Sequence, residues 1–171
     1  MERVNQSGVA DETDVRPAWL SFEELFRAEH GRLLRALFLV TGSAQEAEDV
    51  MQEAFVRVWD RWDRVRTMND PVGYLYRTAM NAFRSRYRRA ARAAKRVFTP
   101  RTRTDEIAAV EDRDEAFRAL RSLSPRQREA LVLTEYVGYS SEEAGAVMNI
   151  RPATVRALAH QGRERLKGST T

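Results

Sequence analysis

The stretch SSEEAGAVMNIRPATVRALAHQGRERLK, residues 140–167, carries the signals of two helices separated by a short turn. Ser140 and Glu143 form a capping box that begins the first helix. Residues 149–151 make the turn, and Pro152 begins the second helix, because a proline at the first helical position loses no hydrogen bond. This spacing is typical of a helix-turn-helix, whose second helix enters the DNA major groove. It favours DNA binding over a generic three-helix bundle with a basic outer face.

The second of these helices has two distinct faces. Val155, Leu158, Gly162 and Leu166 recur at helical spacing and are expected to face the first helix. The other face combines small residues, which allow close approach, with polar and basic ones that reach base edges or phosphates. This outward face consists of Ala153, Thr154, Arg156, Ala157, His160, Arg163 and Lys167.

A basic block occupies the middle of the chain. Residues 71–104 hold ten basic and no acidic side chains, whereas residues 1–70 hold nine basic and fourteen acidic ones. Residues 105–171 are nearly balanced, with ten basic and eleven acidic. Abundant arginine alone explains the basic residues but not the missing acids. The block therefore predicts contact with a polyanion, since neutralising phosphates releases condensed counterions.

A long helix is predicted inside this block. Asp70 caps it, Pro71 takes its first position, and it should run to about Arg89. An aromatic ring and arginines on one side would suit an unpaired nucleic-acid strand. The same pattern is equally well explained without a nucleic acid, by a tyrosine at the edge of the bundle and arginines that are simply solvated. The stripe consists of Tyr74, Arg77, Asn81, Arg84 and Arg88.

The helix predicted from Ser43 to about Trp59 is apolar on more than one side. A stripe through Val50 and Val58 is extended around the helix by Phe55 and Val56. An excess of apolar surface indicates a protein partner, although a central helix buried on two sides would show the same pattern.

Composition excludes several classes of protein. The 171 residues include no cysteine and only two histidines, so no disulfide and no Cys- or His-built metal site is expected. There is no nucleophile–base arrangement and no Gly-rich phosphate loop, so neither an enzyme nor a cofactor is predicted. No apolar run is long enough to span a membrane, and the polar N-terminus lacks a signal-peptide core, which predicts a cytoplasmic protein.

The fold class predicted is all-α, because helical periodicity recurs throughout and no alternating run indicates a sheet. Residues 1–17 read as a disordered tail, 18–90 as a bundle of three or four helices, and 113–171 as the helix-turn-helix domain. Periodicity fades over residues 91–112, which we interpret as a flexible linker.

Three segments in this order resemble the sigma factors of bacterial RNA polymerase, of the extracytoplasmic-function type. AEDVMQEAFVRVW at 47–59 is similar to the helix that grips the polymerase clamp, and DPVGYLYRTAMN at 70–81 to the promoter-melting helix of region 2. LSPRQRE at 123–129, followed by residues 140–166, resembles region 4. The resemblance implies a polymerase-binding surface of Asp49, Gln52, Glu53, Phe55, Val56 and Trp59.

The resemblance also assigns roles to the DNA-binding segments. The Tyr74–Arg88 stripe would hold the opened minus-ten element, with Trp62 and Arg64 of the loop 60–69 near the flipped base. The helix 152–167 would bind the minus-thirty-five element. The implied partners are core polymerase (clamp and flap), promoter DNA and an anti-sigma protein, without insertion into a membrane. The rival is a self-standing helix-turn-helix regulator whose N-terminal bundle dimerises or binds a ligand.

The turn and the helix-turn-helix depart from the family pattern in a few places. Asn149 stands where glycine is usual, and Arg151 where a capping Ser or Thr is common. Gly145 and Gly162 replace better helix formers, each at a cost of about 1 kcal/mol.

Overall fold

The computed structural model describes residues 21–96 and 115–168, and this part of the chain is helical without a strand. The prediction of an all-α fold is confirmed. The predicted tail at 1–17 and the linker beyond Arg96 lie outside the described residues. The elements are α1 (Phe22–Thr41), α2 (Ala44–Trp59), α3 (Trp62–Val65), α4 (Pro71–Arg96), α6 (Glu115–Arg121), α7 (Pro125–Leu131), the π-helix η1 (Val132–Tyr136), α8 (Ser141–Met148) and α9 (Pro152–Gly168).

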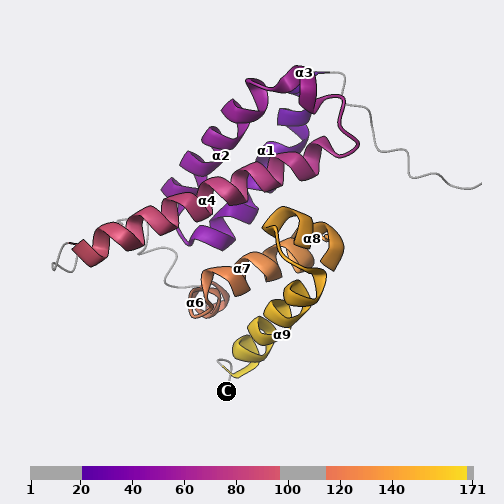
Figure 1. Cartoon of the computed structure of the whole chain (residues 1–171). Helices are drawn as coiled ribbons and strands as arrows, with labels where there is room; N and C mark the ends of the chain where they lie inside the picture. Colours follow the sequence, from indigo (N-terminus) through magenta and orange to yellow (C-terminus); the bar gives the residue numbers. More distant parts are fainter. Residues whose placement is uncertain (1–20, 97–114, 169–171) are drawn as a thin grey trace, which may run out of the picture.

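The N-terminal bundle is built from α1, α2 and α4 (Figure 1). Ser21 and Glu24 form a capping box at the start of α1, and Gly42 ends the helix with a left-handed φ of 74°. Helix α2 packs against both α1 and α4, so its second apolar side is partly explained by burial between two helices. Leu33, Val50 and Leu75, one from each helix, are fully buried in the shared core.

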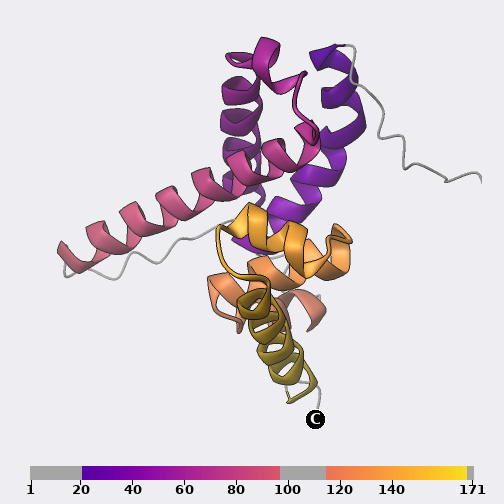
Figure 2. The same ribbon diagram turned by 45° about the vertical axis from the view of Figure 1, so that its right-hand side comes forward.

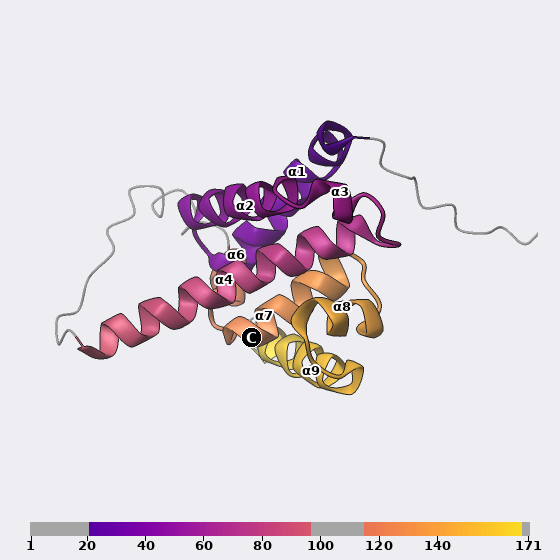
Figure 3. The ribbon, with the colours of Figure 1, turned by 45° about the horizontal axis from the view of Figure 1, so that its top comes forward.

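Helix α4 is longer than predicted and reaches Arg96 rather than Arg89. Residues 90–96 are rich in alanine and basic side chains, which are strong helix formers, so the helix continues where the apolar periodicity fades. Its C-terminal part projects beyond the rest of the molecule in all three views (Figures 1–3). The first residues assigned to the linker are therefore helix.

The C-terminal domain packs α9 across α7 and α8. The predicted capping box of Ser140 with Glu143 forms, and a second one joins Ser124 to Gln127 at the start of α7. Asn149 adopts the left-handed conformation with φ 55°, which asparagine tolerates, and so replaces the usual glycine of the turn.

Two glycines of this domain, Gly145 and Gly162, lie where neighbouring segments approach closely. A Cβ atom at Gly145 would lie 2.8 Å from the carbonyl oxygen of Ile150. One at Gly162 would lie 2.7 Å from Leu131 Cδ1. The absence of a Cβ atom at both positions therefore allows α9 and the turn before it to pack closely against α7 and α8, and this packing offsets the poor helix propensity of glycine.

The two domains are docked on each other, with α4 between the α1–α2 pair and α8 (Figures 1 and 3). Tyr76 and Met80 of α4 are fully buried, and Tyr76 meets Tyr139 with ring centroids 5.6 Å apart. The sequence predicted two domains and a linker but gave no indication of this docked arrangement.

Candidate nucleic-acid and protein interfaces

The end of α2 presents an exposed apolar surface. Val56 is 58% exposed and Trp59 54% exposed, and Gln52 is also exposed. The Trp59 ring leans edge-on against Phe22 with centroids 5.0 Å apart, which holds it at the surface. These three side chains are available to a partner.

The other three residues predicted on this surface are engaged within the molecule. Phe55 is only 5% exposed and packs against Phe22 and Phe26, so it belongs to the core and supports the surface from beneath. Asp49 and Glu53 form ion pairs with Arg86 of α4, at 3.6 Å and 3.0 Å. The sequence did not reveal this link between α2 and α4.

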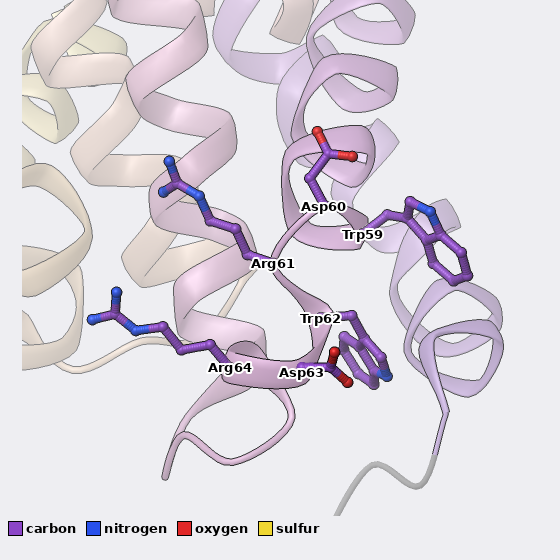
Figure 4. A pocket seen from close by; sticks show the side chains of 6 residues that line it. All are labelled: Trp59, Asp60, Arg61, Trp62, Asp63 and Arg64. Carbon is purple, nitrogen blue, oxygen red and sulfur yellow. The ribbon is translucent and has the colours of Figure 1, made fainter.

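The loop predicted after α2 is partly helical, because it contains α3, and it surrounds a hollow of about 840 Å³ lined by residues 59–64. Arg61 and Arg64 project from one side of the loop, and the rings of Trp59 and Trp62 lie on the other (Figure 4). Trp62 is half-buried, with its ring 5.8 Å from that of Phe22, whereas Arg64 is exposed. The loop therefore separates an aromatic side from a basic side.

Arg61 is a candidate functional residue that the sequence reading missed. Its Nη1 donates a hydrogen bond of 3.3 Å to the Tyr74 hydroxyl, which joins the loop to the start of α4. The only sequence signal was a pair of arginines, Arg61 and Arg64, three residues apart around a tryptophan. The two arginines alone do not indicate a role for Arg61; its contact with Tyr74 does.

The stripe on α4 is only partly open to solvent. Arg77, Asn81 and Arg88 are exposed, and Tyr74 is half-buried at the edge of the bundle. Arg84 departs from the prediction, because its side chain is turned toward the second domain and is only 12% exposed. Beyond the stripe, Arg89 and Arg92 are exposed on the projecting end of the helix.

The outward face of α9 is exposed as predicted. On the packed side Val155 and Gly162 are buried, whereas Leu158 and Leu166 are half-buried, and Ala159, which was not predicted there, is also buried. Several outward cations have carboxylate partners, since Arg156 pairs with Glu142 at 3.6 Å and Arg163 with Glu135 at 2.6 Å. Exposed pairs of this kind contribute little and are screened by salt, so phosphates can replace the carboxylates. The exposed outward residues are Ala153, Thr154, Arg156, Ala157, His160, Arg163 and Lys167.

Metal-binding clusters and membrane-spanning helices are both absent from residues 21–96 and 115–168. This part of the chain contains no group of three His, Asp or Glu side chains placed to hold a metal ion. None of its helices combines the length and the apolar character needed to cross a bilayer.

Comparison with known families assigns both domains. Residues 25–93 match the model of Sigma-70 region 2, and residues 113–166 match that of Sigma-70, region 4. The ECF RNA polymerase sigma factor SigE of Mycolicibacterium smegmatis is 31% identical over 94% of this chain and 66% of its own length. The RNA polymerase sigma factor CarQ of Myxococcus xanthus is 32% identical over 86% of this chain and 87% of its own length.

Solved structures show the same arrangement of helices. The sigma factor RpoE from Bartonella quintana, crystallised with the anti-sigma factor NepR, matches with a TM-score of 0.73. It is 22% identical, and the match covers 87% of this chain and 96% of that one, so it bears on the fold. CnrH, solved with the cytosolic domain of CnrY, is 27% identical with a TM-score of 0.59 over 86% of this chain and 85% of its own.

Regions 2 and 4 occur together in this chain, and this combination disfavours a self-standing regulator. The partners that the two regions imply are core RNA polymerase and promoter DNA. The chain belongs to the RNA polymerase sigma factors and is a member of the extracytoplasmic-function type, which act in transcription initiation.

Proposed function

We propose that three separate surfaces divide the work of this sigma factor. The exposed end of α2 binds the polymerase clamp, α4 with the preceding loop holds the opened minus-ten element, and α9 binds the minus-thirty-five duplex. The observation that carries the proposal is the aromatic and basic surface at the start of α4. There Tyr74 is hydrogen-bonded to Arg61 of the loop that also presents Arg64, and the exposed Arg77 follows three residues later on the helix.

The α2 surface has the composition of a binding hot spot. Trp59 and Val56 expose apolar area beside the exposed amide of Gln52, and aromatic anchors surrounded by polar groups dominate protein interfaces. Asp49 and Glu53 remain partly exposed while paired with Arg86, so they can also meet a basic partner. Phe55 contributes by supporting the surface and makes no direct contact.

The start of α4 fits an unpaired strand better than a duplex. A base can stack on Tyr74, whose ring is held by the hydrogen bond from Arg61, while Arg77 and Arg64 meet the backbone. Trp62 lies against Phe22 on the other side of the loop, where it supports the pocket for a flipped base. Asn81 and Arg88 extend the contact along the helix, and Arg84 joins them when the second domain moves away.

The outward face of α9 fits a major groove. Ala153 and Ala157 leave room for the helix to approach, and Arg156 lies between them on the exposed side. Arg163 and Lys167 lie farther along the helix, where they can bind phosphates. Thr154 and His160 can form hydrogen bonds with base edges or with phosphates.

The protein itself catalyses nothing in this proposal and uses no cofactor, because the polymerase supplies the chemistry of RNA synthesis. It would work in the cytoplasm, where the polymerase is. An anti-sigma protein is a further expected partner, since RpoE of Bartonella quintana was solved with the anti-sigma factor NepR.

The test is run-off transcription with core polymerase on a genomic DNA library, with and without this protein. We expect a small set of new start sites that share upstream sequences at two fixed positions. The same start sites with and without the protein would contradict the proposal. Binding of the isolated protein as a dimer to duplex sites would favour the self-standing regulator instead.

A further inference from the structure

The docked arrangement buries one arginine of the strand-binding stripe. Arg84 forms an ion pair with Glu129 of α7, and its Nη2 also donates to the Asn81 side chain at 2.5 Å and to the Val147 carbonyl at 3.4 Å. The side chain of Glu129 is 1% exposed. A carboxylate from one domain thus occupies the guanidinium that the other domain would offer to DNA.

Further contacts hold the two domains together beside α4, and they join the C-terminal domain to α1. Arg32 of α1 donates to the Val137 carbonyl at 2.5 Å, and Arg128 of α7 donates to the Val40 carbonyl at 2.9 Å. With α8 seated on α4, a strand following the stripe toward Arg84 would meet the second domain. The closed form therefore offers only part of the stripe to DNA.

The buried pair is not a strongly stabilising one. Burial raises the pKa of the Glu129 carboxyl to about 7, because Arg84 and Arg126 offset only part of the lost hydration. Ion pairs of this kind often stabilise no more than apolar residues of similar volume would. The contact is therefore suited to opening when another ligand competes for Arg84.

In the closed form, the surfaces proposed to bind the minus-ten and minus-thirty-five elements are too close together to bind both elements of one promoter. Elements named minus-ten and minus-thirty-five are separated by about 25 base pairs, or roughly 85 Å of duplex at 3.4 Å per base pair. A compact chain of 171 residues has a radius of gyration of only about 16 Å. Simultaneous binding of both elements requires the domains to separate.

We propose that Glu129 acts as an internal substitute for a DNA phosphate, occupying Arg84 and thereby keeping the free protein in a closed form with low affinity for single strands. Undocking of the C-terminal domain transfers Arg84 from Glu129 to the backbone of the opened strand. This inference rests on the proposed role of the α4 stripe. It assigns Glu129 an autoinhibitory role, with no contact to DNA.

The test compares Glu129→Lys with Glu164→Lys in the full chain at about pH 8, where Glu129 is ionised. Both variants change the charge by the same amount in the same domain, but Glu164 is exposed on α9 and outside the domain contact. Binding of a fluorescein-labelled oligothymidylate of about 12 nucleotides is followed by anisotropy, and opening by the radius of gyration from X-ray scattering.

We expect Glu129→Lys to expand the molecule and to bind the oligonucleotide about tenfold more tightly than Glu164→Lys. Arg32→Ala is the second opening variant, because it removes the contact to Val137 from outside every DNA surface. It should expand the molecule and raise affinity in the same direction, and circular dichroism should show unchanged helix content in both.

Two results would overturn the proposal. One is expansion without a gain in affinity, which would mean that closure does not mask the stripe. The other is a molecule that stays closed in both variants. The role of the stripe is checked separately with Tyr74→Ala: if that change weakens binding in the closed and opened proteins alike, the stripe binds DNA whether or not Glu129 restrains it. If it weakens neither, the proposed function of the stripe fails.

Discussion

A Cβ atom at Gly162 would lie 2.7 Å from Cδ1 and 3.2 Å from Cγ of Leu131, a residue buried in the core on α7. Gly162→Ala should therefore destabilise the C-terminal domain by about 1–3 kcal/mol, even though alanine is the better helix former. Urea unfolding followed by circular dichroism measures the change. Gly31→Ala is the matched control: apart from the adjoining helix backbone, no atom lies within 4 Å of a Cβ placed at that position in α1, so it should stabilise by about 0.5–1 kcal/mol. Equal stabilisation by both substitutions would contradict the close packing of α9.

Trp59→Ala should weaken association with core polymerase, because it removes the largest exposed apolar side chain of the α2 surface. We expect a loss of at least tenfold in affinity, or about 1.4 kcal/mol, as for other aromatic anchors. Pull-down or biolayer interferometry with core polymerase measures it. Glu48→Ala, an exposed change on the same helix, is the control. Since Trp59 contacts Phe22, thermal unfolding must show that the bundle stays folded. Wild-type affinity in a folded Trp59→Ala variant would exclude this surface.

Arg156→Ala should reduce discrimination between promoter sequences by about 1–3 kcal/mol if the guanidinium bonds to a base edge. A phosphate contact would instead weaken binding to all sequences and flatten the salt dependence. Holoenzyme binding to a set of upstream duplexes at several salt concentrations separates the two. Retention of both affinity and sequence preference would place the reading face elsewhere on α9.

Tyr74→Ala should reduce open-complex formation by about tenfold or more, because stacking on one base contributes roughly 1–3 kcal/mol. Permanganate reactivity of thymines in the promoter bubble reports the opening. Binding to core polymerase and to the upstream duplex should not change. A promoter supplied with a mismatched bubble should restore only part of the activity, since the stacking contact stays lost. Tyr74→Phe keeps the ring but loses the bond from Arg61, and should have a smaller effect. Wild-type permanganate reactivity in the Tyr74→Ala complex would mean that Tyr74 does not stack on the opened strand and is only an aromatic residue at the edge of the bundle.

The raised pKa of Glu129 makes stability depend on pH in a defined direction. Its pKa is about 7 in the folded chain against a reference value of 4.5, so the folded state binds the proton more tightly than the unfolded state. This group's contribution to the free energy of unfolding therefore falls as pH rises between about 4.5 and 7, by up to about 3 kcal/mol. Glu129→Gln should remove that part of the slope in urea unfolding measured across this window. An unchanged slope would contradict the raised pKa.

Helix ends were predictable because they depend on local chemistry. Ser124 and Ser140 cap the helices where their sequence signals place them, and Gly42 ends α1 by adopting a left-handed backbone. The end of α4 was predicted too early, because apolar periodicity reports packing, whereas the helix continues past the point where packing stops.

The residues that sequence reasoning misplaced are those whose environment comes from distant segments. Phe55 and Val56 look alike in the sequence, but the first packs against α1 and the second faces solvent. Arg84 lies on the predicted face of α4 yet bonds to Glu129, 45 residues away. Periodicity predicts which side of a helix a residue occupies; it does not predict that another domain covers part of that side.

Arg86 has a consequence for how the promoter is positioned. Its guanidinium lies between α4, which carries it, and the α2 carboxylates of Asp49 and Glu53. These ion pairs join α2, the helix proposed to bind the polymerase, to α4, the helix proposed to hold the unwound strand. On these proposed roles, the spacing between the enzyme and the first unpaired bases is set within the N-terminal bundle, by contacts that include no residue of the C-terminal domain.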